Sequence, residues 1–280
     1  MTMTNNNSPI GVFDSGLGGL SVLRKCMQIM PGESFIYYGD SLHAPYGTKT
    51  LSEVQERSFD ITELLMGQGI KALVVACNTA TSAAVKLMRE RYKELPLVGI
   101  EPAIKPAAVR HPGKTVLVMA TPMTLSEVKF KRLKSRYEDT ARIIDVPCPG
   151  LMEYIEKGIL SGGELDDYLK GKLCDYDMTD VGAIVLGCTH YPFIYDELKS
   201  IVGDKIEIID GSEGTAREIK RRIELAGISC EGTGQGELLL MNSATDEIVN
   251  AVHSSDRIVI RNQPENPYLQ RSVTLLSLPW

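Results

Sequence analysis

The chain has 280 residues, of which 43% are hydrophobic and 24% charged, and its formal net charge is -6. This length allows one large domain or two domains that each bury a core, and the composition excludes disordered and collagen-like proteins. The negative charge argues against a nucleic-acid partner, because affinity for phosphate backbones depends on clustered Lys and Arg. The opening MTMTNNNSP has no apolar signal-peptide region and no run of 18 apolar residues follows, so we expect a cytoplasmic protein without a membrane partner.

Short apolar runs that end in Gly, Ser, Thr, Asn or Asp alternate with helix-like periodic stretches along the chain. The predicted strands are residues 10–13, 34–38, 72–76, 97–100, 115–119, 183–186 and 206–209, and the clearest predicted helices are 20–27, 51–66 and 165–174. This alternation is typical of βα units whose strands form a parallel sheet. The sequence therefore predicts an α/β protein with mainly parallel sheets.

A weak internal repeat indicates two related halves. Residues 10–25 are echoed by 115–131, residues 71–88 by 182–198, and residues 97–107 by 206–218, in the same order. We infer two pseudo-symmetric α/β domains, the first from residues 1–100 plus 211–280 and the second from residues 101–210. Because open parallel sheets bind ligands beyond the carboxyl ends of their strands, we expect an interdomain active-site cleft.

Two of the cysteines stand out by their surroundings. The chain has six, which are Cys26, Cys77, Cys148, Cys174, Cys188 and Cys230. Their wide spacing fits neither a disulfide framework nor a zinc site, and most are expected to be small buried hydrophobic residues. Cys77 and Cys188 each follow a predicted strand and precede a polar pair, so each thiol should lie beside backbone N–H groups that open a helix and favour thiolate. We predict one reactive thiol in each half.

Asp14 and His190 are the predicted proton partners of these thiols. Asp14 ends the first predicted strand and should share a sheet edge with Cys77; a lone Asp there would be an N-cap, but a thiol that exchanges protons needs a partner. His190 is the only histidine of the four that lies beside a candidate thiol, and its ordinary pKa is near neutrality. The other three histidines are expected to be surface or structural residues.

The glycine-rich turn at residues 16–19 is not a dinucleotide motif, because the sixth position of GxGxxG counted from Gly16 is Ser21. Such a turn can still bind an anion, including a carboxylate, through its amides. No Walker motif, no metal-spaced His/Cys cluster and no pyridoxal-specific pattern is present in the sequence. We therefore expect neither a cofactor nor a metal.

Five motifs resemble those of bacterial glutamate racemases, within the aspartate/glutamate racemase family. They are FDSGLGGLSV, DSLHAPYG, VVACNTAT, GIEPA and VLGCTHYP, in the family's order and at similar spacing, over roughly residues 10–255. The resemblance implies a cofactor-independent enzyme that binds glutamate between two α/β domains and supplies D-glutamate for peptidoglycan. It implies that Cys77 and Cys188 exchange the α-proton on opposite faces, with Asp14 assisting Cys77 and His190 assisting Cys188.

The resemblance also implies further site residues. A glutamate of the second domain falls on Glu156 in CPGLMEYIEKG, with Glu153 one turn earlier as the alternative. Substrate contacts are expected from hydroxyl and backbone donors at Asp14, Ser15, Tyr46, Gly47, Asn78, Thr79, Thr121, Thr189 and His190. The expected partner is the small molecule glutamate, the sequence leaves a homodimer open, and residues 256–280 carry no family motif.

Other readings of the sequence stay open. An aspartate or hydantoin racemase would share the mechanism and differ in the pocket for the distal carboxylate. A non-catalytic binding protein on the same fold is disfavoured by the presence of both thiols with Asp14 and His190. A thiol hydrolase is disfavoured because a second, opposed cysteine is redundant for acyl transfer.

Overall fold

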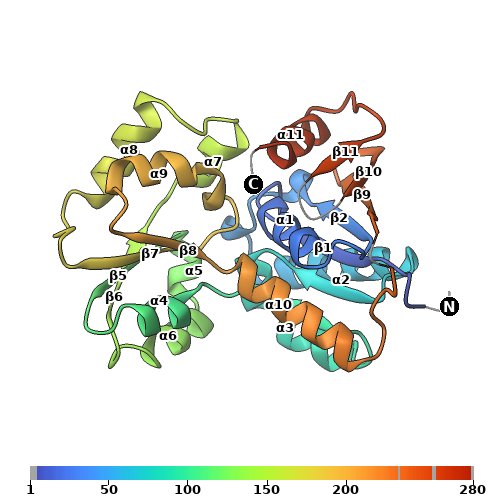
Figure 1. Cartoon of the computed structure of the whole chain (residues 1–280), viewed down its shortest axis with the longest axis horizontal. Helices are drawn as coiled ribbons and strands as arrows, with labels where there is room; N and C mark the ends of the chain where they lie inside the picture. Colours follow the sequence, from blue (N-terminus) through green and yellow to red (C-terminus); the bar gives the residue numbers. More distant parts are fainter. Residues whose placement is uncertain (1–4, 233, 254–256, 279–280) are drawn as a thin grey trace. The chain divides into compact units, whose positions relative to one another are not determined.

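The computed structural model describes residues 5–232, 234–253 and 257–278. These residues form two compact units, one built from the chain up to Ile100 and from Ser212 onward, the other from Glu101–Gly211. In Figure 1 the first unit therefore contains both the blue and the red parts of the chain. None of the described helices is long and apolar enough to cross a membrane.

The first unit contains a seven-stranded sheet in the order β11-β10-β9-β2-β1-β3-β4. Its strands are β1 (Ile10–Asp14), β2 (Phe35–Gly39), β3 (Ala72–Val75), β4 (Leu97–Gly99), β9 (Gly236–Asn242), β10 (Thr245–His253) and β11 (Ile258–Ile260). The strands from β9 to β4 are parallel, whereas β10 and β11 join antiparallel. Every residue of β1, β2 and β3 is buried, as expected for strands covered on both faces.

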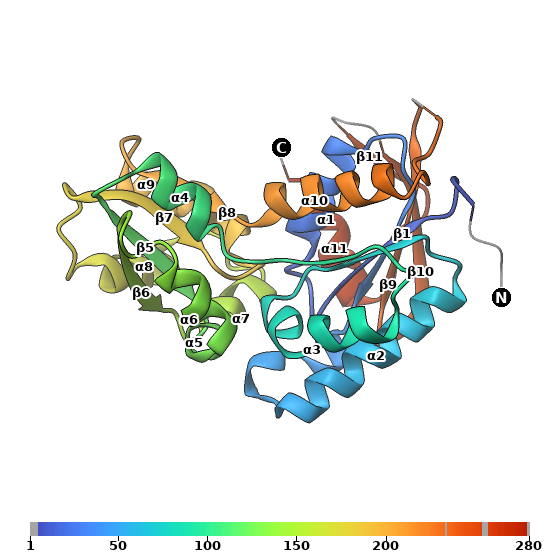
Figure 2. The same ribbon diagram turned by 90° about the horizontal axis from the view of Figure 1, so that it is seen from below.

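Helices cover both faces of this sheet. They are α1 (Leu20–Ile29), α2 (Leu51–Gly67), α3 (Asn78–Arg91), α10 (Ser212–Leu225) and α11 (Pro267–Leu276), with the short 3-10 helices η1 (Ser41–His43) and η2 (Tyr46–Thr48). α1 packs against α10 on one face and α2 against α3 on the other (Figure 2). A capping box formed by Thr50 and Glu53 begins α2 and so ends the loop that leaves β2.

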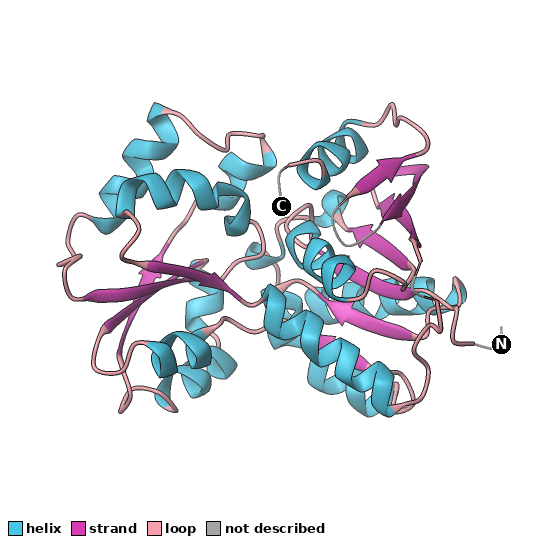
Figure 3. Ribbon diagram, in the orientation of Figure 1, coloured by secondary structure: helices cyan, strands magenta, loops and turns pink. Residues whose placement is uncertain are grey.

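The second unit contains a four-stranded parallel sheet in the order β6-β5-β7-β8. Its strands are β5 (Thr115–Ala120), β6 (Arg142–Pro147), β7 (Val181–Leu186) and β8 (Glu207–Asp210), and its helices are α4 (Ile104–Arg110), α5 (Pro122–Ser126), α6 (Val128–Ser135), α7 (Leu151–Glu156), α8 (Gly163–Leu173), η3 (Tyr191–Ile194) and α9 (Tyr195–Val202). The first three of these helices cover one face and the other four cover the opposite face (Figure 3), each over its own apolar cluster.

The predicted fold class, α/β with mainly parallel sheets, is confirmed. The order β2-β1-β3-β4 in the first unit is matched by β6-β5-β7-β8 in the second, so the echoed segments begin on strands with equivalent places in the two sheets. Four strands were missing from the sequence-based prediction, namely β6, β9, β10 and β11. All four lie toward an edge of their sheet, where one side of a strand can face water and the apolar run is interrupted.

Candidate functional site

Three polar side chains meet at the carboxyl edge of the first sheet. β1 ends at Asp14, Asp40 directly follows β2, and Cys77 follows β3. Because these strands are parallel neighbours, their carboxyl ends share one edge. Ser15, the residue after Asp14, lies within reach of the thiol of Cys77. The structure thus brings Asp14, Ser15 and Cys77 together.

Cys77 is nearly buried and stands at the N-terminus of α3. Its Sγ accepts the backbone N–H of Ala80 at 3.5 Å and is 3.6 Å from the hydroxyl Oγ of Ser15, to which the thiol donates. The Ser15 hydroxyl in turn donates to Asp14 Oδ1 at 3.3 Å, and the Gly16 amide donates to the same oxygen at 2.9 Å. A continuous hydrogen-bonded path therefore connects a fully buried carboxylate to the thiol, beside helix amides that favour a thiolate.

Asn78 and Thr79 form the first turn of α3 and are both buried. The side-chain oxygen Oδ1 of Asn78 is buried without a hydrogen-bond partner among the described residues. Leaving such an acceptor unpaired costs about 1–3 kcal/mol. Asn78 therefore offers an unused acceptor for an N–H donor, next to the thiol of Cys77.

Tyr46 and Gly47 lie in the loop between β2 and α2. The ring of Tyr46 packs in the same apolar cluster as Cys77, and its hydroxyl donates to Asp40 Oδ2 at 2.6 Å. Burial and the charge of Asp40 raise the pKa of Tyr46. Because this hydroxyl is committed to Asp40, the loop can offer a ligand its backbone amides, and an added Cβ at Gly47 would meet no atom within 4 Å.

Asp40 was not among the predicted site residues. Burial alone would raise the pKa of this carboxyl, but hydrogen bonds from Arg57, Tyr46 and His43 hold it below its ordinary value. Arg57 makes two of these bonds, from Nε at 3.1 Å and from Nη2 at 3.0 Å. Asp40 could have been predicted from the same pattern as Asp14, because each is an aspartate at the carboxyl end of an apolar strand.

In the second unit, Cys188 follows β7 and Thr121 follows β5 at the carboxyl edge of the sheet. Thr121 caps α5, where its Oγ1 accepts the Thr124 amide at 3.3 Å. Thr189 is buried beside Cys188. This edge therefore holds a thiol and two hydroxyl groups from the predicted set.

Cys188, His190 and Glu156 form a chain of contacts. His190 Nδ1 lies 3.8 Å from the Cys188 Sγ, and His190 Nε2 lies 2.7 Å from Glu156 Oε1. Burial lowers the pKa of His190, but its hydrogen bonds with Cys188 and Glu156 and their charges raise it well above the ordinary value. Glu153 is exposed, whereas Glu156 at the end of α7 contacts the imidazole. The arrangement favours the imidazolium form of His190.

The remaining cysteines have different surroundings. Burial raises the pKa of both Cys26 and Cys148 to about 12, so both are expected to stay protonated. Cys174 is exposed and Cys230 is partly exposed. Among the described residues, no group of three or more His, Cys, Asp or Glu side chains could hold a metal ion.

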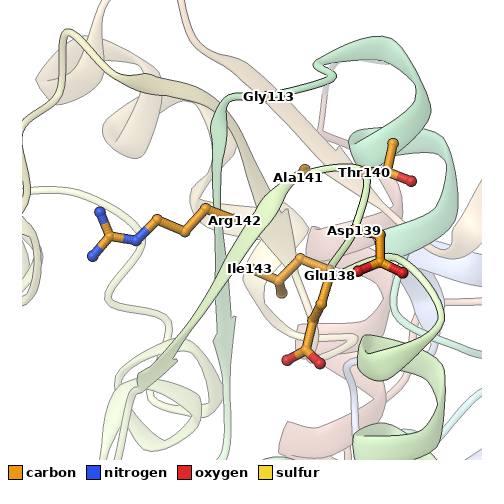
Figure 4. A pocket seen from close by; sticks show the side chains of 7 residues that line it. All are labelled: Gly113, Glu138, Asp139, Thr140, Ala141, Arg142 and Ile143. Carbon is orange, nitrogen blue, oxygen red and sulfur yellow. The ribbon is translucent and has the colours of Figure 1, made fainter.

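A cavity of about 380 Å³ lies elsewhere in the second unit, lined by residues that include Gly113, Glu138, Asp139 and Arg142 (Figure 4). These residues precede β5 or lie before and at the first residue of β6, so the cavity is at the amino ends of these strands. The thiol of Cys188 is at the carboxyl ends. The cavity is therefore separate from the candidate site residues of this unit.

Comparisons with known proteins agree on one family. The model of the Asp/Glu/Hydantoin racemase family matches residues 10–219. A glutamate racemase of Clostridium perfringens is 53% identical over 241 residues, which are 86% of this chain and 93% of that protein. The crystal structure of glutamate racemase from Thermus thermophilus in complex with β-chloro-D-alanine is 33% identical, with a TM-score of 0.72 over 87% of this chain and 90% of that one. The glutamate racemase of Francisella tularensis in complex with D-glutamate is 26% identical, with a TM-score of 0.77 over 98% and 95% of the two chains.

Proposed function

The chain belongs to the Asp/Glu/Hydantoin racemase family and is thus an isomerase, and we propose that it interconverts L- and D-glutamate by proton exchange with Cys77 and Cys188. The main support for this proposal is that each unit has a thiol just beyond the end of an equivalent strand, and that each thiol contacts its own proton partner. Relatives at about half identity over most of their length are glutamate racemases, which favours glutamate over aspartate or a hydantoin.

The chemistry requires two groups. The α-proton of an amino acid is very weakly acidic, and inversion at that carbon needs a base on one face and an acid on the other. In the proposed reaction one cysteine thiolate takes the α-proton and becomes a thiol. The other cysteine thiol then gives its proton to the opposite face and becomes a thiolate, and the reverse reaction exchanges these roles.

The two proton partners have distinct proposed parts. In the first unit, the Ser15 hydroxyl connects the Cys77 thiol to the Asp14 carboxylate, which can receive or return its proton. In the second unit, the imidazolium of His190 favours the thiolate of Cys188, and Glu156 keeps that imidazole protonated. No step in this scheme uses a cofactor or a metal.

Substrate binding is proposed to use the groups around Cys77 together with hydroxyl groups of the second unit. The unpaired Oδ1 of Asn78 suits the α-ammonium group, which needs acceptors. The backbone amides of Tyr46 and Gly47 suit a carboxylate. Thr121 and Thr189 are proposed to contact glutamate from the second unit, and the product D-glutamate is proposed to supply peptidoglycan synthesis.

Circular dichroism of separate D-glutamate and L-glutamate solutions with the purified protein, without added cofactor, tests the proposal. Both solutions should lose their signal as they approach the same equimolar mixture. A folded protein that left both enantiomers unchanged, or that acted on aspartate in their place, would contradict the proposed substrate. Activity that disappears on exhaustive chelation and returns with a metal ion would contradict the metal-free mechanism.

A further inference from the structure

The turn between β9 and β10, residues 242–244, lies outside the part of the chain that the family model matches. β9 lies beside β2 (Figure 1) and pairs with it in parallel. The last residue of β9, Asn242, is opposite Gly39, the last residue of β2. The turn is therefore carried to the carboxyl edge of the sheet. The loop with Tyr46 and Gly47 starts from the same place.

Asn242 connects the turn to this loop. Its side chain is buried, its Nδ2 donates to the Ser41 Oγ at 2.8 Å, and its Oδ1 accepts the Ala244 amide at 3.0 Å. The approach is close, since a Cβ added to Gly39 would lie 3.0 Å from the Asn242 Nδ2. One amide group thus fixes both the shape of the turn and its contact with the loop.

Ser243 makes further connections. Its backbone N–H donates to the Gly39 carbonyl at 2.9 Å, and its Oγ accepts the Leu42 amide at 3.0 Å. The Ser243 side chain also helps to lower the pKa of the Asp40 carboxyl. The first residues of the loop are therefore held by both the backbone and the side chain of Ser243.

Asp40 transmits this restraint to Tyr46. The same buried carboxylate accepts the Tyr46 hydroxyl at 2.6 Å and is clamped by Arg57. Tyr46 packs in the cluster that contains Cys77. The contacts of the β9–β10 turn with Ser41 and Leu42, and those of the adjoining Asp40 with Tyr46, therefore connect the turn to the loop beside the first thiol.

We propose that Asn242 and Ser243 are positioning residues that hold the Tyr46–Gly47 loop in the conformation that binds a substrate carboxylate. This inference rests on the proposed function. We take this carboxylate to be the side-chain carboxylate of glutamate, which keeps the same charge in the bound substrate and in the transition state because it is not conjugated with the α-carbon, so the loop contributes equally to both. Loss of its position should then raise KM and leave kcat nearly unchanged.

The test compares Ser243→Ala and Asn242→Ala with the matched control Asn262→Ala. Asn262 accepts the Asn250 amide at 2.7 Å and donates to the Ile248 carbonyl at 2.9 Å, so it makes a similar pair of bonds in the same C-terminal segment without touching the loop. Each loop variant should raise KM for D-glutamate about tenfold, as expected for a lost hydrogen bond near a charged group. Asn262→Ala should lower the melting temperature similarly and keep KM. Ser243→Thr, which retains the hydroxyl, should restore most of the affinity.

Hydrogen exchange of the loop peptide supplies a readout that does not depend on activity. Exchange in residues 40–48 should become faster in Ser243→Ala and Asn242→Ala and stay unchanged in Asn262→Ala. An unchanged KM in the folded loop variants, or an equal rise in Asn262→Ala, would overturn the proposal. Failure of the proposed function would look different, since the wild-type protein itself would leave glutamate unchanged. The hydrogen-exchange rates of residues 40–48 would in that case still show whether the β9–β10 turn holds the loop.

Discussion

The two units present their thiols at equivalent places but give them different partners. Cys77 and Cys188 each lie two residues beyond the end of their strand, and Ser15 and Thr121 directly follow the neighbouring central strand in each unit. Strand order and strand length thus bring a thiol and a hydroxyl-bearing residue to the carboxyl ends of neighbouring strands in both halves. The repeat of the fold therefore sets where each thiol lies, and the residues around it set its proton chemistry.

The partners differ in whether they titrate above neutral pH. Cys77 Sγ accepts a backbone amide of α3, and its thiol donates to the Ser15 hydroxyl, which contacts Asp14. The amide does not titrate. Cys188 has His190, whose pKa is raised by the thiol and by Glu156 despite burial. We therefore expect the pH dependence above neutrality to include a strong contribution from the second unit.

The largest expected effect follows from replacing either thiol. Cys77→Ser and Cys188→Ser should each fold and lose racemisation in both directions by more than about 10³-fold, because serine is a far weaker base and general acid/base catalysis commonly contributes about 10²–10⁴-fold. Circular dichroism with each glutamate enantiomer measures this loss. Near wild-type racemisation by either variant would contradict the assignment of its thiol.

Elimination separates the two faces of the substrate. From β-chloroalanine, a thiolate removes the α-proton and chloride leaves from Cβ, so no acid is needed on the other face. Cys77→Ser should retain chloride release from one enantiomer and Cys188→Ser from the other. Release from the same enantiomer by both variants would show that the two thiols do not serve opposite faces.

Alkylation tests which thiols are reactive. Iodoacetamide should abolish activity by modifying Cys77 and Cys188, whereas Cys26 and Cys148 should be unmodified in the folded protein because burial raises their pKa to about 12. Peptide mass spectrometry with glutamate present and absent measures the sites. Inactivation that follows modification of Cys26 or Cys148 would contradict the prediction that the thiols at the strand ends are reactive and the thiols in the core are not.

Glu156→Gln should have a smaller effect, with a defined sign in pH. The charge of Glu156 helps raise the pKa of His190, so its removal should let His190 lose its proton at lower pH. The alkaline limb of the pH profile of kcat/KM should shift to lower pH. The maximum of kcat/KM should fall about 10- to 100-fold, because a less protonated His190 assists proton transfer at Cys188 less well.

Glu153→Gln is the matched control, because Glu153 is exposed one turn earlier on α7. It removes the same charge from the same helix without removing a contact to His190. Its pH profile should stay that of the wild type. A similar shift in both variants would mean that the general charge of α7, and not the Glu156 contact, controls His190.

The sequence predicted the central parts of this molecule better than its edges. The central strands β1, β3, β5 and β7 are buried along their whole length, so they appear as apolar runs and locate both thiols. β6 and β10 mix buried, partly buried and exposed residues, which interrupts such runs. The resemblance to the aspartate/glutamate racemase family is confirmed by the comparisons.

Long-range polar contacts were beyond sequence reasoning. Arg57 holds Asp40, and Ser243, about two hundred residues further along the chain, holds the loop that follows Asp40; no local sequence pattern predicts such partners. Glu156 was predicted from the family resemblance, but its contact with His190 was not, since two residues 34 positions apart show no spacing signal. The sequence therefore identified the two thiols and their neighbouring residues, and the structure was needed to identify the side chains that hold those residues in place.

The smallest predicted effect concerns stability and compares one buried histidine from each unit. In His253 burial lowers the pKa, opposed by a hydrogen bond to the Glu33 carbonyl, whereas contacts with Cys188 and Glu156 raise the pKa of His190. A folded-state pKa below the unfolded value of about 6.5 means that the stabilisation is present above pH 6.5 and is lost as the pH falls through the folded-state pKa.

His253→Gln keeps a side-chain N–H donor for the Glu33 carbonyl but does not titrate in this range. Between pH 7 and pH 5, the free energy of unfolding of the wild type should therefore decrease more steeply than that of the variant, by at most about 1.4 kcal/mol for each unit by which burial lowers the pKa. Urea unfolding at a series of pH values measures the two slopes. Equal slopes would show that His253 titrates as it does in the unfolded chain, and the contrast between the two buried histidines would then have to be explained by His190 alone.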